Sequence, residues 1–436
     1  MNYKKNFAIV FAISLLSILG FNELNAQDAK VPGGDEKVPL GVEARNGKLF
    51  FSSDDGDFQW WFDSRIQVDG AIYNENLNEM SNGIILRRAT FALKAVLWRD
   101  WQAEFDMDFG EDTDTDPQTD WRDMWIKYTF PKFNLALQVG NFKEPFGMER
   151  LNSSRLLTFL ERSAGSNAFP MGRRIGGSAR YWTDYGQVTA AIMGHELGTR
   201  VDKGQQDEGY STNLRVSVAP INKFGNNLHV GLAGSYKIPD VTSELRANTI
   251  EISARTETYV SNPKLLHTGD IKEVNYYNRY GAELMYINGP FYFQSEFMGA
   301  LIKRWDINNK YSLLNRNPNI HLKGGYVMAT YMLTGETRYY YVDEGEVGPI
   351  ESPKNSWGAV ELAARYSVTD LNDPKAGIIG GQSNQLMLGV NYYPNTNIKL
   401  QFNYSMVNLD KNANRKGNLI GDDDHSFIQM RVQASL

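Results

Sequence analysis

Alternation of apolar and polar residues constrains the fold of this chain more than any other feature of the sequence. In one stretch, Ala103, Phe105 and Met107 alternate with Glu104 and Asp106. Successive side chains of a β-strand point to opposite faces, so this pattern predicts a strand with one apolar and one polar face. The sheets of a soluble β-sandwich or solenoid alternate in the same way, so one such strand leaves the fold class open.

The number and spacing of these segments separate the fold classes. We place sixteen strands, at residues 58–73, 84–97, 101–110, 122–130, 135–142, 174–182, 185–193, 211–219, 227–236, 277–287, 291–300, 324–333, 357–367, 384–393, 398–407 and 426–436. Short turns alternate with long connections between them. Bacterial outer-membrane barrels have an even number of strands, short periplasmic turns and long external loops. The sequence therefore predicts an all-β fold, a 16-stranded antiparallel transmembrane β-barrel.

Aromatic residues cluster beside the predicted short turns. Amphipathic rings favour the boundary between membrane and water, so a cluster at one end of successive hairpins indicates a membrane interface. Aromatic residues scattered within strands would not repeat this position. The residues concerned are Trp98, Trp101, Phe130, Phe133, Tyr181, Trp182, Tyr185, Tyr286, Phe291, Tyr392 and Tyr393.

The composition excludes several classes of protein. The chain of 436 residues has no cysteine, which excludes a disulfide framework and thiolate metal sites. Its formal net charge of −6 argues against nucleic acid as a partner. The histidines are dispersed and lie in no nucleophile or metal-ligand motif. We therefore expect no enzyme, no catalytic residues, no metal and no cofactor; the histidines are His195, His229, His267, His321 and His425.

The amino terminus has the pattern of an export signal. Lys4 and Lys5 precede the apolar run FAIVFAISLLSILG, and Ala26 offers a small residue at a cleavage position. The run is shorter than the about 20 residues of a membrane-spanning helix. We expect residues 1–26 to be a signal peptide and residues 27–57 to be a periplasmic lead with a short hairpin that turns at Asp54 to Gly56. Residues 58–436 would form the transmembrane β-barrel domain.

The alternation also predicts register and closure. The outward residues of strands 84–97 and 101–110 are odd-numbered, so Lys94 should lie opposite Glu104 or Asp106 on the inner face. The last strand should pair with the first and close the barrel. Its residues predicted to face lipid are Ile428, Met430, Val432, Ala434 and Leu436.

A barrel of sixteen strands is too wide for its own side chains to fill, so we expect a polar interior around an aqueous channel. One long connection, GNFKEPFGMERLNSSRLLTFLERSAGSNAFPMGRR at residues 140–174, is external by strand parity. Asn152 is a candidate helix cap. Beyond it, Leu156, Phe159 and Leu160 share one face of a predicted helix, and Arg155, Thr158 and Arg162 share the other.

We expect this helix inside the barrel, with its apolar face on the wall and its arginine face in water. The connection would then be an inward-folded constriction loop, where charge controls ion passage. A helix on the membrane surface would show the same pattern. The candidate anion-contacting residues of the loop are Lys143, Arg155, Arg162, Arg173 and Arg174.

Inward-facing charges of the strands form a second candidate set. The basic candidates in the lumen are Arg65, Arg88, Lys94, Arg180 and Arg215. Acidic residues such as Asp63, Glu104 and Glu283 are interleaved with them, so many of these charges would pair across strands and stabilise the wall. A continuous ladder of arginines is not visible in the sequence.

Several blocks resemble the phosphate-selective porin O and P family. They are GNFKEPFGMERLNSSRLLTFLERS, RRATFALKAVLWRDWQAEFDMDFG, GGYVMATYMLTGETRYY, WGAVELAARYS and LMLGVNYYPNTNIKLQFNY. The resemblance implies a homotrimer of 16-stranded barrels in the outer membrane of a Gram-negative bacterium, with inward-folded loops and a preference for anions. It also implies that the long connection Thr334 to Ser356, where parity predicts a short turn, folds into the lumen.

The expected function is an outer-membrane channel for passive diffusion of small hydrophilic solutes, with a preference for anions such as phosphate or polyphosphate. Its partners would be outer-membrane lipid and small anionic solutes. The alternative is a surface-binding or assembly barrel whose long external loops, at Lys237 to Tyr276 and Val407 to His425, bind a partner. Conductance separates the two, since an adhesin does not need to conduct.

The exported protein is expected to begin at Gln27, because the charged segment, the apolar run and Ala26 form one cleavable signal. Amino-terminal sequencing of protein from the outer membrane checks this. Retention of Met1 in the assembled protein would contradict it.

Overall fold

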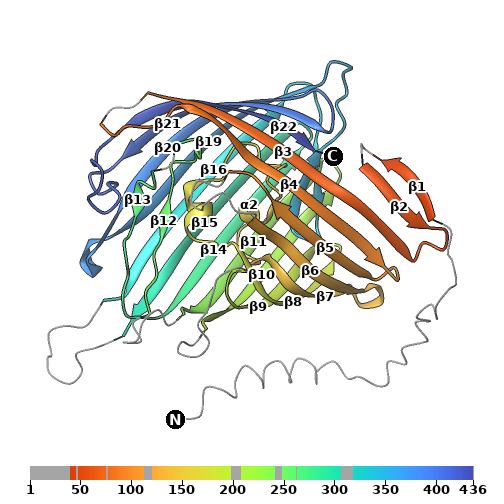
Figure 1. The fold of residues 1–436 in the computed structure, drawn as a ribbon, viewed down its shortest axis with the longest axis horizontal. Coiled ribbons are helices and arrows are strands. Elements are labelled where there is room, and N and C mark those ends of the chain that lie inside the picture. The colour runs from red at the N-terminus through yellow and green to blue at the C-terminus, as the bar shows by residue number, and fades with distance from the viewer. Residues whose placement is uncertain are drawn as a thin grey trace, which may run out of the picture. The chain divides into compact units, whose positions relative to one another are not determined.

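The computed structural model describes residues 40–45, 48–74, 77–111, 120–197, 208–240, 248–261, 263–305 and 318–435. The predicted signal peptide lies outside the described residues. Sixteen strands form the barrel (Figure 1). They are β3 (Phe58–Asn74), β4 (Gly83–Leu97), β5 (Trp101–Asp108), β6 (Asp120–Phe130), β7 (Leu135–Lys143), β8 (Arg173–Thr183), β9 (Gly186–Met193), β10 (Tyr210–Lys223), β11 (Asn226–Ile238), β14 (Val274–Asn288), β15 (Phe291–Arg304), β16 (Ile320–Met332), β19 (Ala359–Asp373), β20 (Ile378–Tyr393), β21 (Ile398–Leu409) and β22 (His425–Ser435).

Each of these strands pairs antiparallel with the next, and β22 pairs with β3, with Phe427 opposite Tyr73. The predicted closure is therefore confirmed. A hairpin of β1 (Leu40–Arg45) and β2 (Lys48–Ser53) extends the sheet, because Phe50 of β2 lies opposite Trp61 of β3. The turn predicted at Asp54 to Gly56 joins β2 to β3, and Gly56 N donates there to the Ser53 carbonyl oxygen.

The register of the first hairpins follows the alternation. Lys94 lies opposite Glu104, and its Nζ is 3.2 Å from Glu104 Oε1. On the outer face of the same strands, Leu93 and Phe105 are exposed. The predicted ion pair is therefore confirmed, with Glu104 and not Asp106 as the partner directly opposite.

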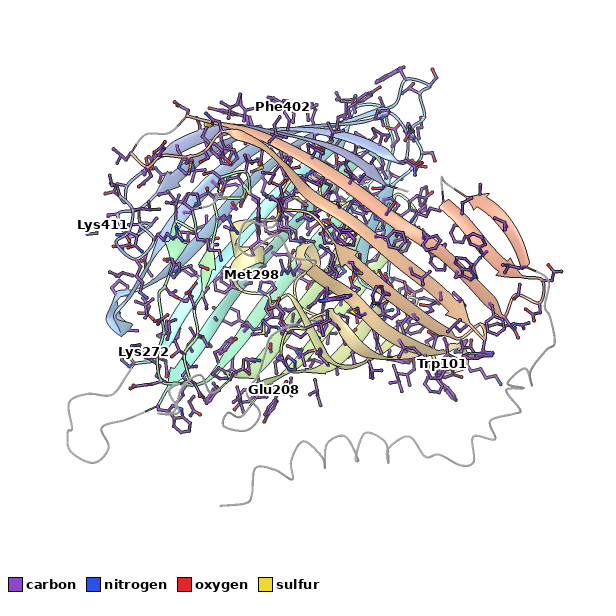
Figure 2. The ribbon with its side chains drawn as sticks, viewed as in Figure 1. Trp101, Glu208, Lys272, Met298, Phe402 and Lys411 are labelled. Carbon is purple, nitrogen blue, oxygen red and sulfur yellow. The ribbon has the colours of Figure 1, made fainter. Side chains whose placement is uncertain are left out.

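The outer face also carries the predicted apolar residues of the last strand. Ile428, Met430 and Val432 are exposed, while Leu436 lies outside the described residues. Trp101, beside a short turn, lies at the end of the barrel opposite to Lys272 and Lys411 (Figure 2). Most of the predicted aromatic residues at the short turns are exposed, but Tyr393 is buried and its hydroxyl donates to Glu361.

One predicted long loop is absent. Instead of the connection expected between residues 367 and 384, β19 and β20 continue to a tight turn formed by a 3-10 helix, η2 (Pro374–Ala376). Gly377 follows it with a φ of 76°, a left-handed conformation that glycine adopts without strain. The alternation in this region is weakened by polar residues on both faces, which is why the sequence did not show the strand extension.

The interior is not uniformly polar, which corrects the expectation from the sequence. Buried side chains of β14, β15, β16 and β20 form one apolar cluster with Phe146, Met148, Phe159 and Phe169 of the connection 144–172. Acidic and basic side chains face the interior along β3 to β8. The open space therefore lies along the charged wall, and the opposite wall is packed against the inserted connection.

Deletion of residues 427–436 is expected to abolish assembly of the barrel in the membrane. The loss of β22 would leave β3 and β21 with unpaired edges, and each unsatisfied backbone group in hydrocarbon costs several kcal/mol. Heat-modifiable mobility in electrophoresis of outer-membrane fractions measures assembly. Met430→Leu is the control, because it keeps an apolar side chain on the lipid face; normal assembly of the truncation would refute closure by β22.

Candidate functional site

The connection 144–172, between β7 and β8, lies inside the barrel, but it does not contain the predicted helix. Two short helices are present, α2 (Met148–Leu151) and α3 (Ala164–Ala168). Asn152 is the residue that ends α2, with its N–H donating to the Met148 carbonyl oxygen. Between the two helices, residues 152–163 form no helix.

Side chains of the wall replace the missing helical hydrogen bonds. Leu160 N donates to Asn403 Oδ1 at 3.0 Å, and the Leu160 carbonyl oxygen accepts from Arg431 at 2.6 Å. The Thr158 carbonyl oxygen accepts from Asn391 and Gln401. Because a buried backbone needs partners but not necessarily helical ones, this stretch of turns and bends can remain non-helical.

Glu161 fixes the centre of this connection to the wall. Its carboxylate lies 2.9 Å from Arg87 Nε, 2.8 Å from Arg431 Nη2 and 3.5 Å from Arg88 Nη2. Burial alone would raise the pKa of Glu161, but the three guanidinium groups hold it well below its usual range. The carboxylate is thus ionised and shared among three cations.

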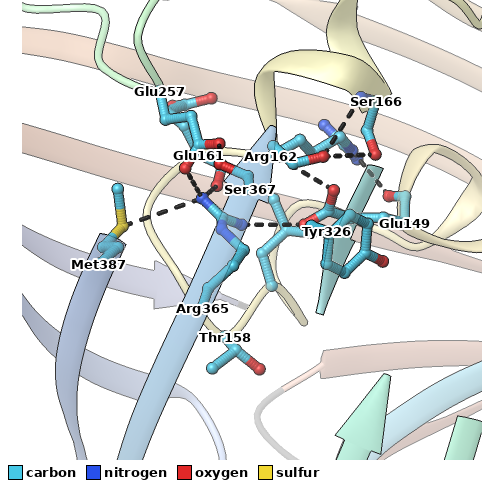
Figure 3. Close-up of polar contacts among 12 residues, drawn as sticks. Glu149, Thr158, Glu161, Arg162, Ser166, Glu257, Tyr326, Arg365, Ser367 and Met387 are labelled. Carbon is cyan, nitrogen blue, oxygen red and sulfur yellow. Dashed lines mark hydrogen bonds and ion pairs between the residues drawn. The ribbon is translucent and has the colours of Figure 1, made fainter. Parts of the chain in front are cut away.

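A second anchor joins three segments around Arg365 of β19 (Figure 3). Its guanidinium contacts Glu149 at 3.0 Å and also Glu257, which belongs to the connection between β11 and β14. Glu257 accepts from Ala164 N at 3.0 Å, so this second connection packs on the first. The part of it at residues 248–261 therefore lies against the inserted connection, and not free at the surface as the alternative function requires.

The connection 333–358 enters the lumen from the other end of the barrel. It forms a hairpin of β17 (Arg338–Tyr341) and β18 (Glu346–Ile350). Arg215 donates to the carbonyl oxygens of Glu344 and Gly345, and Val347 N donates to Asn152 Oδ1 at 3.3 Å. A Cβ on Gly345 would lie 2.6 Å from Ser217 Oγ, and its φ is +62°. The inward fold that the resemblance implied is confirmed, and only glycine fits at its tip.

Two cavities remain beside the inserted connections. The first has a volume of about 390 Å³ and is lined by nine cationic and six acidic side chains, and the second has a volume of about 780 Å³. Asp63, Lys94, Ser153 and Arg155 line both, so the cavities meet there. At this junction Asp63 contacts three cations. They are Arg155 at 2.5 Å, Lys94 at 3.4 Å and Lys48 of β2 at 3.1 Å.

The structure brings seven of the ten predicted basic residues to the first cavity. They are Lys143, Arg155 and Arg173 of the loop, and Arg65, Lys94, Arg180 and Arg215 of the wall. Arg162 does not face water as predicted, because it is buried and donates to the carbonyl oxygens of Glu149 and Asn152. Arg88 is occupied by Gln67 and Glu161, and Arg174 pairs with Glu196 at 3.7 Å.

Most charges of the first cavity are paired, as the interleaved sequence indicated. Glu104, Asp106 and Asp123 lie close together but contact Lys94, Arg122 and Arg173 respectively. Three cations differ, because no ion pair joins Arg65, Lys127 or Lys143 to an acid among the described residues. Lys127 lies over the Trp125 ring, and Lys143 Nζ donates to the carbonyl oxygens of Leu151 and Asn152. Their positive charges are therefore not cancelled by a direct contact.

Sequence reasoning missed three charged residues of the cavity: Arg122, Glu344 and Glu346. Arg122 precedes the inward-facing Asp123, so strict alternation places it outside, but a register shift between Phe105 and Met107 brings both inside. Glu346 lies on the lumenal hairpin, and its burial, together with Glu344, raises its pKa to about 7 although Lys143 opposes this. The hairpin of β17 and β18 shows no alternation of apolar and polar residues that would have predicted it from the sequence.

Comparison with known proteins agrees with this geometry. The family model for phosphate-selective porin O and P matches residues 62–435. Porin O of Pseudomonas aeruginosa is 26% identical over 426 residues, covering 89% of this chain and 90% of that protein. Among solved structures, an anion-selective porin from Comamonas acidovorans has a TM-score of 0.53 at 12% identity and covers 87% of this chain and 100% of that chain. A trimer form of OmpT from Vibrio cholerae has a TM-score of 0.52 at 10% identity, with 87% and 99% covered.

Glu161→Gln is expected to lower the thermal unfolding midpoint in detergent, because removal of one partner from a buried ion pair costs about 3–5 kcal/mol. The same change at Glu196 is the matched control. Glu196 is largely exposed and pairs with Arg174 at 3.7 Å, so its loss should cost at most about 1 kcal/mol. Equal midpoints for both variants would show that Glu161 does not anchor the connection.

Proposed function

Because the chain belongs to the phosphate-selective porin O and P family, we propose that it forms an outer-membrane channel for passive diffusion of small hydrophilic solutes, with a preference for anions such as phosphate or polyphosphate. The closed barrel provides the passage, and the family is one of channels rather than of enzymes. The proposed preference for anions rests on the excess of cationic side chains around the first cavity.

That charge is the observation on which the proposal rests. The chain has a formal net charge of −6, yet the side chains lining the first cavity comprise nine cations and six acids. A basic cavity within an acidic protein attracts anions, and low-dielectric walls strengthen the attraction. Arg65, Lys127 and Lys143 are the leading candidates for direct contact with an anion, since none of them is in an ion pair among the described residues.

Arg155 is the candidate that controls passage between the cavities. It comes from the inserted connection, lines both cavities and reaches Asp63 on β3. Charges act over about 8 Å at physiological ionic strength, so they matter most where a passage is comparably narrow. The loop residues Lys143, Arg155 and Arg173 therefore serve as the constriction set, with Arg65, Lys94, Arg180 and Arg215 on the wall.

The proposed assembly is a homotrimer in the outer membrane of a Gram-negative bacterium, reached after removal of residues 1–26. The trimer form of OmpT from Vibrio cholerae, a structure of similar fold, supports the proposed oligomeric state. The exposed apolar side chains around the barrel support lipid as a partner. A surface-binding barrel, the alternative function, is less well supported because residues 248–261 pack inside against Ala164 and Arg365.

Arg155→Glu is expected to reduce the ratio of anion to cation permeability by about tenfold. The change reverses one charge at the junction, where a unit charge about 8 Å away is worth about 2 kcal/mol before screening. Reversal potentials of single channels in a planar bilayer under a salt gradient measure the ratio.

Lys411→Glu is the matched control, because Lys411 lies in the connection between β21 and β22 and lines neither cavity. Its reversal potential should stay near that of the parent protein. An Arg155→Glu channel that conducts with unchanged anion preference would remove the junction from the selectivity mechanism. A folded barrel with no conductance at all would contradict the proposed function itself.

A further inference from the structure

The outer wall of the barrel has a hollow that the channel does not use. It lies where the last strands meet the first, on the outer face of β19 to β22 and β3, which lie side by side (Figure 1). Its volume is about 650 Å³. The lining residues that point outward, away from the lumen, are Asn74, Tyr366, Asn384, Leu386, Met406, Asn408 and Ser426.

Amide and hydroxyl groups form the part of this hollow nearest the external ends of the strands. Asn384 lies opposite Asn408 across β20 and β21, and Ser426 lies opposite Asn74 across β22 and β3. Asp424 accepts a hydrogen bond from Asn408 Nδ2 at 2.6 Å and holds that amide in place. Four neighbouring strands thus present polar groups outward at their external ends.

Other strands end differently at the same side of the barrel. The external ends of β10, β11 and β14 carry Tyr210, Tyr236 and Tyr276. Tyr210 and Tyr236 are exposed on the outer face. Tyrosine is the usual residue for this boundary. The outward polar residues at the external ends of β20, β21, β22 and β3 are therefore a local feature, which the external ends of β10, β11 and β14 do not share.

The part of the hollow nearest the middle of the barrel is apolar. Tyr366 and Met406 are exposed there beside Leu386, and the exposed residues Leu388, Tyr404 and Ile428 continue the same face toward the middle of the barrel. A ligand that fits must have a hydrogen-bonding head above an apolar tail. Asparagine both donates and accepts, which matches the hydroxyl and amide groups of a sugar.

We propose that this hollow binds a glycolipid of the outer leaflet, with its sugar headgroup against the amides and its acyl chains on the apolar floor. No lysine or arginine lines the hollow among the described residues, and Asp424 is acidic, so the sugar and not a phosphate is recognised. The inference rests on the barrel lying in the outer membrane and is independent of what the lumen conducts.

Native mass spectrometry of the detergent-purified full chain incubated with lipid A, an acylated glucosamine disaccharide, tests the proposal. The double substitution Asn384→Leu with Asn408→Leu should reduce the retained lipid A about tenfold, since two hydrogen-bonding groups are lost. Asn278→Leu is the matched control, because it removes an outward amide near the external end of β14, and it should leave retention unchanged.

Two further arms fix the chemistry of the occupant. Lipid A with one phosphate should bind as well as the form with two, and phosphatidylglycerol should bind less. Equal retention by the double variant and the control, or binding that falls with the loss of one phosphate, would overturn the proposal. Because the chain has no cysteine, Asn408→Cys also reports on the rival occupant: disulfide-linked copies in the membrane would show that a second chain covers the hollow.

Discussion

The need to pair every backbone N–H and C=O group within hydrocarbon controls this structure. A strand in lipid has no water to satisfy its edges, so the sheet must close on itself. Closure occurs where β22 meets β3. The number of strands and their stagger then set the diameter of the barrel and the space inside it. The connections between strands that fold into this space then determine which parts of the lumen stay open.

The connections fill the lumen unequally because the two walls differ in character. Phe146, Met148 and Phe159 pack on the apolar wall, and burial of side chains of this size contributes about 1.5–3 kcal/mol each. Glu161 and Arg365 then bind the inserted segment through ion pairs. Their partners come from distant parts of the chain, so the closed barrel holds the insertion in place.

The remaining space has a charge opposite in sign to that of the whole chain. Acidic residues are plentiful in the chain, but Glu161 of the inserted connection and Glu361 of β19 pair with arginines that do not line the first cavity. The cations beside the cavity are only partly matched in this way. A passage that is basic within an acidic protein therefore arises from the distribution of pairs and not from the number of charges.

The sequence by itself determined the number of strands, the register of β4 with β5 and the closure, because a period of two records which face meets lipid. It also identified the connection 140–174 as unusual, and it assigned Arg155 and Lys143 to the lumen. Only the tertiary structure decided that residues 152–163 are not helical, since the hydrogen bonds that replace a helix come from Asn391, Asn403 and Arg431, far along the chain.

Contacts with distant parts of the chain also decide whether each charged side chain lines a cavity or is buried. The sequence placed Arg155 and Arg162 on the same face of a predicted helix. In the structure Arg162 donates to carbonyl groups within the loop, whereas Arg155 lines both cavities. Arg122 entered the cavity through a register shift that no alternation reveals. Sequence patterns record which side of a strand is wet, whereas the partner of each charge depends on which distant residues the closed barrel brings within reach.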